Sequence, residues 1–117
     1  MEEPSAAAGG VQRDAGRAPE PLVRRVNELL AAAGAEPDPV ARHLAAAERT
    51  VARLLRDQST SRASALDLLA ADALATYAFE LAADAPDAIP ALAERAMARF
   101  AALATAAPAE AAPEGRA

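Results

Sequence analysis

The residues best placed to do chemistry are three polar side chains in an otherwise apolar run, Asp72, Thr76 and Glu80. Because they recur every fourth residue, a helix would place them on one narrow stripe. Three interpretations compete: Glu80 pairs with an arginine of another helix, the stripe faces water, or Asp72 and Glu80 together bind a cation. Ion pairs that only stabilise a fold are commoner than functional sites. The sequence therefore predicts no metal site, and the Asp72 and Glu80 pair stays as an alternative.

A second set of charged residues lies between positions 39 and 57, where four arginines fall on one side of an expected helix. Such a stripe could bind an acidic partner, but we expect it to be a solvated outer face. Nucleic acid is disfavoured because the net charge is −5, all twelve basic residues are arginine, and no aromatic side chain interleaves with them. The four arginines are Arg42, Arg49, Arg53 and Arg56.

Few side chains in this sequence are suited to covalent or metal chemistry. There is no cysteine, and the one histidine, His43, falls at the boundary between the apolar and basic sides of its helix. No glycine-rich phosphate loop or nucleophile elbow occurs, and the only glycine pair, Gly9 and Gly10, lies near the N-terminus. We accordingly predict no catalytic residues and no cofactor, and we do not favour an enzyme.

One stretch has a local resemblance to a known family. The run LLAADALATYAFEL, from Leu68 to Leu81, resembles the helix that follows the first aspartate-rich motif of trans-prenyltransferases. The resemblance covers only this run, and the DDxxD motif that would hold magnesium and diphosphate is absent from the sequence. It therefore implies neither the fold nor the activity of that family.

The elements that must position these residues are organised around a central helix, expected from Ser61 to Asp84. At about 100° per residue, this segment has two apolar faces, one around Leu74 and Tyr77 and the other around Leu68 and Phe79. A helix with two apolar faces has to be covered on both sides. Because small residues separate the anchors of the second face, we predict that a second copy covers it. The predicted interface comprises Leu68, Ala71, Ala75, Phe79 and Ala82.

Two further helices are expected before the central helix in the sequence, and one after it. A short helix begins near Leu22 and stops at Gly34, and a second runs from Pro39 to Asp57 with Asp38 as its N-cap. A heptad-like seam of Val40, Leu44, Ala47, Val51 and Leu54 marks the buried side of this second helix, and a last helix, capped by Asp87, ends before Pro108.

The sequence thus predicts an all-α fold, a small antiparallel bundle of three long helices and a shorter N-terminal one. We expect the bundle to span residues 19–107, with disordered tails at 1–18 and 108–117, because these ends carry few large apolar side chains. No leader or membrane span is recognisable, which favours a cytoplasmic protein.

The predicted function is a non-catalytic structural or protein-interaction module that forms a homodimer, with another protein as a further partner. The alternatives are a small helical enzyme or ligand-binding or metal-binding protein using Asp72 and Glu80, and an adaptor that binds an anionic partner through the four arginines.

Overall fold

The computed structural model describes residues 18–106, and these form an all-α fold with no strand. The elements are α2 (Glu20–Ala32), α3 (Pro39–Asp57), α4 (Arg62–Ala82), the short 3-10 turn η2 (Pro86–Ala88) and α5 (Ile89–Ala106). The predicted fold class is therefore confirmed. The expected tails lie outside the described residues, apart from Ala18.

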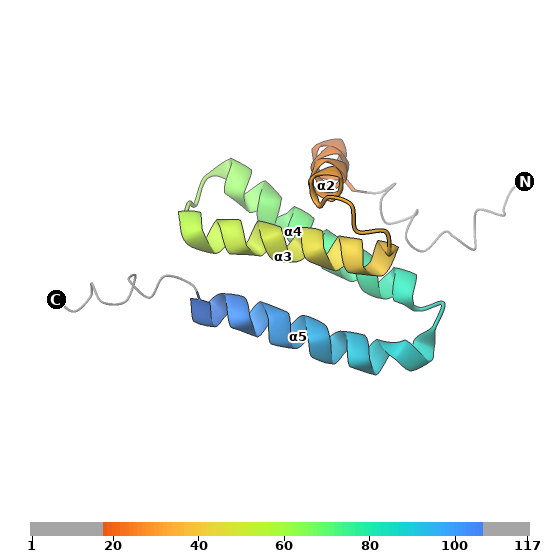
Figure 1. Ribbon diagram of the computed structural model, residues 1–117. Helices are drawn as coiled ribbons and strands as arrows, with labels where there is room; N and C mark the ends of the chain where they lie inside the picture. Colours follow the sequence, from red (N-terminus) through yellow and green to blue (C-terminus); the bar gives the residue numbers. More distant parts are fainter. Residues whose placement is uncertain (1–17, 107–117) are drawn as a thin grey trace, which may run out of the picture.

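Helix α4 runs antiparallel to α3 and α5, which run in the same direction, and α2 lies across α3 and α4 (Figure 1). The most extensive packing is between α3 and α4, and α3 also packs against α2 and α5. Helix α3 is thus the one that packs against all the other helices, whereas the sequence had pointed to α4, against which α2 packs more extensively than against α3.

The helix boundaries follow from local side-chain chemistry. The Asp38 carboxylate accepts a hydrogen bond of 2.9 Å from the backbone N–H of Ala41, which caps α3 as predicted. Ser61 caps α4 in the same way, accepting from the backbone N–H of Ser64 at 3.1 Å. Gly34 has a φ of +89°, a conformation in which glycine ends a helix without steric cost. These stops separate the helices at the predicted places.

Two capping predictions are wrong. The spacing of Ser64 and Asp67 in the sequence predicts a capping box, but Asp67 turns its carboxylate towards α2 and α3 instead. Asp87, expected to cap the last helix, lies inside η2, and α5 begins two residues later. Proline explains the second error, because Pro86 fixes its own φ and starts a 3-10 turn before the α-helix can begin.

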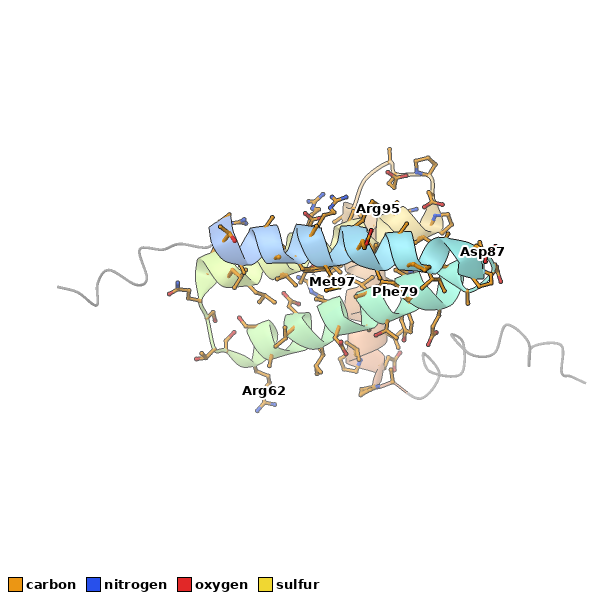
Figure 2. The ribbon with its side chains drawn as sticks, turned by 90° about the horizontal axis from the view of Figure 1, so that it is seen from below. Arg62, Phe79, Asp87, Arg95 and Met97 are labelled. Atoms are coloured by element: carbon orange, nitrogen blue, oxygen red, sulfur yellow. The ribbon has the colours of Figure 1, made fainter. Side chains whose placement is uncertain are left out.

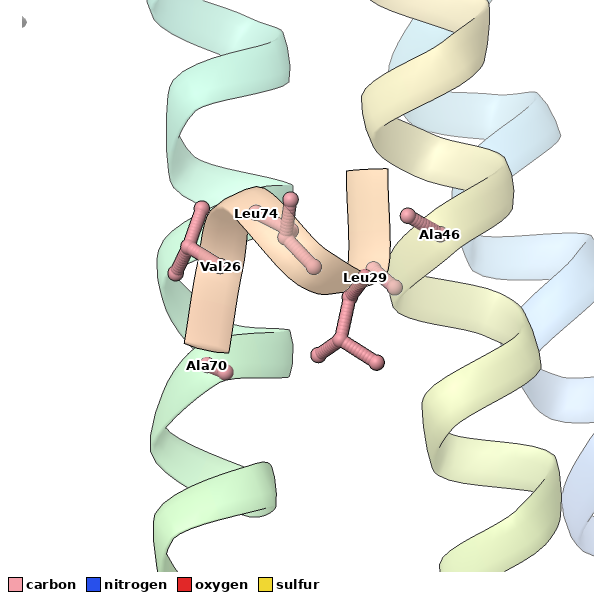
Figure 3. Close-up of a cluster of buried hydrophobic side chains, with 6 residues drawn as sticks. Val26, Leu29, Ala46, Ala70 and Leu74 are labelled. Carbon is pink, nitrogen blue, oxygen red and sulfur yellow. The ribbon is translucent and has the colours of Figure 1, made fainter. Parts of the chain in front are cut away.

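The core is built largely from small residues (Figure 3). On α3 the most buried positions are Ala46, Ala47 and Thr50. Of these only Ala47 belongs to the predicted seam, and the other four seam residues are only half-buried. The Thr50 hydroxyl donates to the carbonyl oxygen of Ala46 at 2.8 Å, so its burial leaves no unpaired donor. Small side chains at these positions allow helices to approach closely. The principal cluster consists of Val26, Leu29, Ala46, Ala47, Ala70 and Leu74.

Candidate functional site

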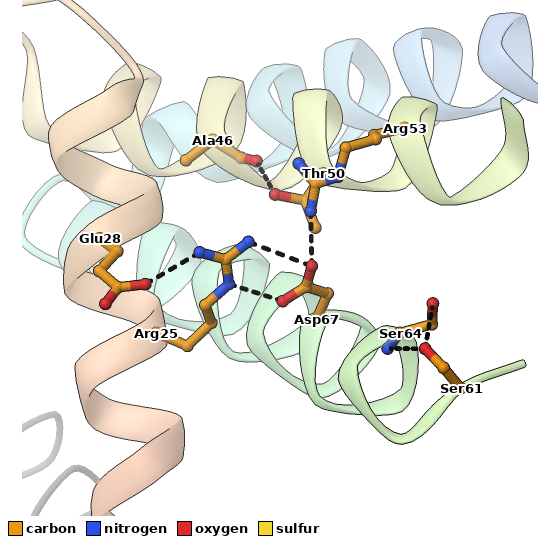
Figure 4. Close-up of polar contacts among 8 residues, drawn as sticks. All are labelled: Arg25, Glu28, Ala46, Thr50, Arg53, Ser61, Ser64 and Asp67. Atoms are coloured by element: carbon orange, nitrogen blue, oxygen red, sulfur yellow. Dashed lines mark hydrogen bonds and ion pairs between the residues drawn. The ribbon is translucent and has the colours of Figure 1, made fainter. Parts of the chain in front are cut away.

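A cluster of charged side chains joins three helices (Figure 4). Asp67 of α4 accepts hydrogen bonds from Arg25 of α2, from Nε at 2.6 Å and from Nη2 at 3.2 Å. It also accepts from Nη2 of Arg53 on α3 at 2.6 Å. Arg25 additionally pairs with Glu28 at 2.9 Å. A single carboxylate therefore binds two arginines that come from two other helices.

The electrostatics of this cluster keep Asp67 ionised. Its side chain is only 13% exposed, and burial alone would favour the protonated acid. The hydrogen bonds from Arg25, and then those from Arg53, outweigh this desolvation and lower the pKa of Asp67, while the pKa of Arg25 is raised by the same contact. Both carboxylate oxygens of Asp67 accept hydrogen bonds from arginines. This arrangement suits a structural role.

Sequence reasoning missed this cluster, although one signal was available. Asp67 lies seven residues before Leu74 and three before Ala70, so a helix places it on the same face as these core residues. A lone carboxylate on the most buried face of a helix needs a cationic partner. That partner could have been expected from the arginines of the neighbouring helices.

The four arginines of α3 are not simply a solvated face. Arg42 Nε donates to the carbonyl oxygen of Leu30 at 3.3 Å, and Arg49 Nη1 donates to that of Ala32 at 3.1 Å. These carbonyls belong to the end of α2, whose last turn has no basic residue of its own. Cations at this position satisfy free carbonyls and complement the helix dipole. Arg49 and Arg56 are exposed, as expected for a solvated face, whereas Arg42 and Arg53 are half-buried and Arg53 is bound to Asp67.

The stripe on the outer side of α4 divides into two kinds of environment. Asp72 and Thr76 are exposed, whereas Glu80 is half-buried, and its Oε1 is buried with no hydrogen-bond partner. No arginine of the described residues pairs with Glu80, so that interpretation of the stripe is wrong for this part of the chain. Residues 18–106 also hold no group of three or more histidine, aspartate or glutamate side chains placed to bind a metal ion.

His43 is fixed by a local hydrogen bond. Its Nδ1 lies 2.8 Å from the carbonyl oxygen of Pro39, one turn earlier in α3. Because a carbonyl oxygen only accepts, Nδ1 carries the proton and donates it. The half-buried ring borders two adjoining pockets between α2 and the start of α3.

The predicted interface residues divide according to what covers them. Ala71 and Ala82 are buried within the chain itself, and Ala75 and Phe79 are half-buried. Leu68 is 59% exposed. The second face of α4 is therefore covered by this chain's own helices over much of its width, and its outer edge remains open.

A large apolar side chain of α5 extends this edge. Met97, which the sequence pattern places on the inward face, is 71% exposed. Figure 2 shows Met97 and Phe79 on the same side of the molecule, although α5 packs against α3 and hardly touches α4. We call Leu68, Ala75, Phe79 and Met97 the α4–α5 apolar surface. The interface predicted from the sequence includes Leu68, Ala75 and Phe79 of this surface but not Met97.

The described helices include none that combines the length and the apolar character needed to cross a bilayer. Comparison of the chain with protein-family models, with curated proteins and with solved structures gave no match.

Proposed function

We propose that this protein is a non-catalytic helical interaction module that pairs with a second copy of itself through the α4–α5 apolar surface. The observation that supports this proposal best is the exposure of Leu68 and Met97, at 59% and 71%. Full burial of a side chain of this size is worth about 2 kcal/mol relative to leaving it in water. Two such anchors on each copy give a driving force for association.

The form of the surface suits a twofold contact. In a twofold dimer the same patch serves both subunits, so an apolar patch can meet itself without a charge mismatch. Ala75 lies between Leu68 and Phe79 along α4, and its small side chain lets a second helix come close to the backbone. Leu68 and Met97 would then be the contacts that lose most solvent.

The other candidate functions have weaker support. An enzyme or a metal-binding protein would need Asp72 and Glu80 to converge, yet Asp72 is exposed and the Oε1 atom of Glu80 is buried. An adaptor for an anionic partner would need free arginines on α3, where Arg49 and Arg53 are engaged within the chain.

Charging both anchors is expected to convert the dimer to a folded monomer. We predict that the double variant Leu68→Glu, Met97→Glu has half the mass of the wild type in light scattering after size exclusion, with unchanged helical circular dichroism. A carboxylate at each anchor would be desolvated without a partner on association, which is strongly unfavourable. Phe79→Glu is a poorer choice, because Phe79 is half-buried and also serves contacts within the chain.

Leu69→Glu is the matched control. Leu69 is also highly exposed, at 57%, but it lies about 100° further round α4, away from the apolar surface. This variant should remain dimeric. If the wild type were monomeric at about 100 µM, a concentration at which even a weak dimer should form, the proposal would be contradicted.

A further inference from the structure

Two adjoining pockets lie where α2 crosses the N-terminal half of α3, on a different part of the molecule from the α4–α5 apolar surface. The inner pocket has a volume of about 180 Å³ and the outer one of about 300 Å³. Three residues, Asn27, Leu30 and His43, border both of them. The two pockets therefore adjoin at these residues.

The inner pocket is apolar and lies among three helices. Leu22, Val23 and Val26 of α2 line it, together with Tyr77 of α4. None of its lining residues is charged. Because an enclosed apolar space of about 150 Å³ accommodates benzene, this pocket is large enough for a phenyl ring or a branched aliphatic group.

The outer pocket has a cationic side. Of the described residues that line the two pockets, only Arg42 is charged. Its Nε donates to Leu30 at 3.3 Å, and it forms no ion pair with any described residue. The nearby carboxylates do not line either pocket: Asp38 accepts from Ala41, and Glu36 accepts from the backbone N–H of Asp38 at 3.1 Å. A half-buried guanidinium without a carboxylate partner is a suitable site for an anion.

From this arrangement we infer that the two pockets together bind a small hydrophobic carboxylate, with its apolar body in the inner pocket and its carboxylate on Arg42. His43 and Asn27 border both pockets and offer hydrogen-bonding groups along the ligand. An apolar cavity with a few polar groups that fix orientation is the usual form of a small-molecule site. This inference does not depend on the dimer, since the pockets and the apolar surface share no residue.

The direct test compares probes of matched shape and opposite charge on the wild-type protein. 3-Phenylpropanoate is expected to bind with a dissociation constant at least tenfold lower than that of 3-phenylpropylamine, measured by calorimetry or ligand-observed NMR. Propanoate, which lacks the apolar body, should bind more weakly than phenylpropanoate by a similar factor. Equal binding of the acid and the amine, or no binding of either at millimolar concentration, would overturn the inference.

Two variants locate the site. Arg42→Gln should weaken phenylpropanoate binding at least fivefold, and Val23→Trp, which fills the inner pocket, should abolish it. Arg49→Gln is the matched control, because Arg49 makes an equivalent contact to the end of α2 but borders neither pocket. If Arg49→Gln weakened binding as much as Arg42→Gln, the arginine effect would come from loosening α2, and the assigned carboxylate site would be wrong.

Discussion

Replacing Asp67 by alanine is expected to lower the free energy of unfolding by about 2 kcal/mol. The change leaves Arg25 and Arg53 without their shared carboxylate, at a place where their side chains are only 31% and 34% exposed. Removing one partner of a buried ion pair costs 3 to 5 kcal/mol, and we reduce this value because both arginines retain some contact with water. Urea denaturation followed by circular dichroism measures the effect.

Asp72→Ala is the control for this prediction. Asp72 lies on the same helix and loses the same charge, but it is exposed, so its replacement should change stability by less than about 0.5 kcal/mol. If the two variants were equally stable, the charged cluster would contribute nothing to the fold.

The same carboxylate should also be visible in the dependence of stability on pH. Because the pKa of Asp67 is lowered in the folded protein, the unfolded chain takes up a proton first as the pH falls. The contribution of Asp67 is then fully present at neutral pH and is lost progressively below about pH 4. Asp67→Ala should therefore lose less stability than the wild type as the pH is lowered from 5, because it lacks this carboxylate.

The second large effect is expected at the centre of the core. Leu74 is fully buried, at 0% exposure, between α4 and its neighbours. Leu74→Ala should lower the free energy of unfolding by about 3 kcal/mol, because it removes buried apolar atoms and leaves a cavity. In a core built mainly of alanine, few long side chains are available to move into the space.

Leu69→Ala provides the comparison, since the same atoms are removed from a side chain that is 57% exposed. We expect Leu69→Ala to lower the free energy of unfolding by less than about 1 kcal/mol. The free energy of unfolding should decrease with urea concentration at the same slope in both variants. Comparable losses at the two positions would mean that Leu69 is buried in the protein in solution, for example by a second copy.

The parts of the fold that could be predicted are those decided by neighbouring residues. Asp38, Ser61 and Gly34 act on the backbone within three residues of themselves, so the ends of α2, α3 and α4 follow from the sequence. The crossing of α2 over α3 and α4 is decided instead by which side chains meet across helices. Helical periodicity carries no such information.

At the candidate site too, local patterns were predictable from the sequence and contacts between helices were not. The pattern of α4 correctly indicates two apolar faces, but Ala71 and Ala82 pack equally well against the chain's own helices or against another copy. Only the folded structure shows that Ala71 and Ala82 are buried within the chain and that Met97 is left exposed. The partners of Asp67 were likewise unpredictable from spacing, because Arg25 lies 42 residues away along the chain.

The shared carboxylate of Asp67 also bears on how the molecule opens in its native state. Helix α2 contributes only Val26 and Leu29 as buried residues, so its detachment exposes less apolar surface than separation of α3 from α4. When α2 leaves, Arg53 still neutralises Asp67 within the α3–α4 hairpin, and no charge is stranded. We therefore expect the amides of α2 to exchange with solvent through a partial opening of lower free energy than global unfolding.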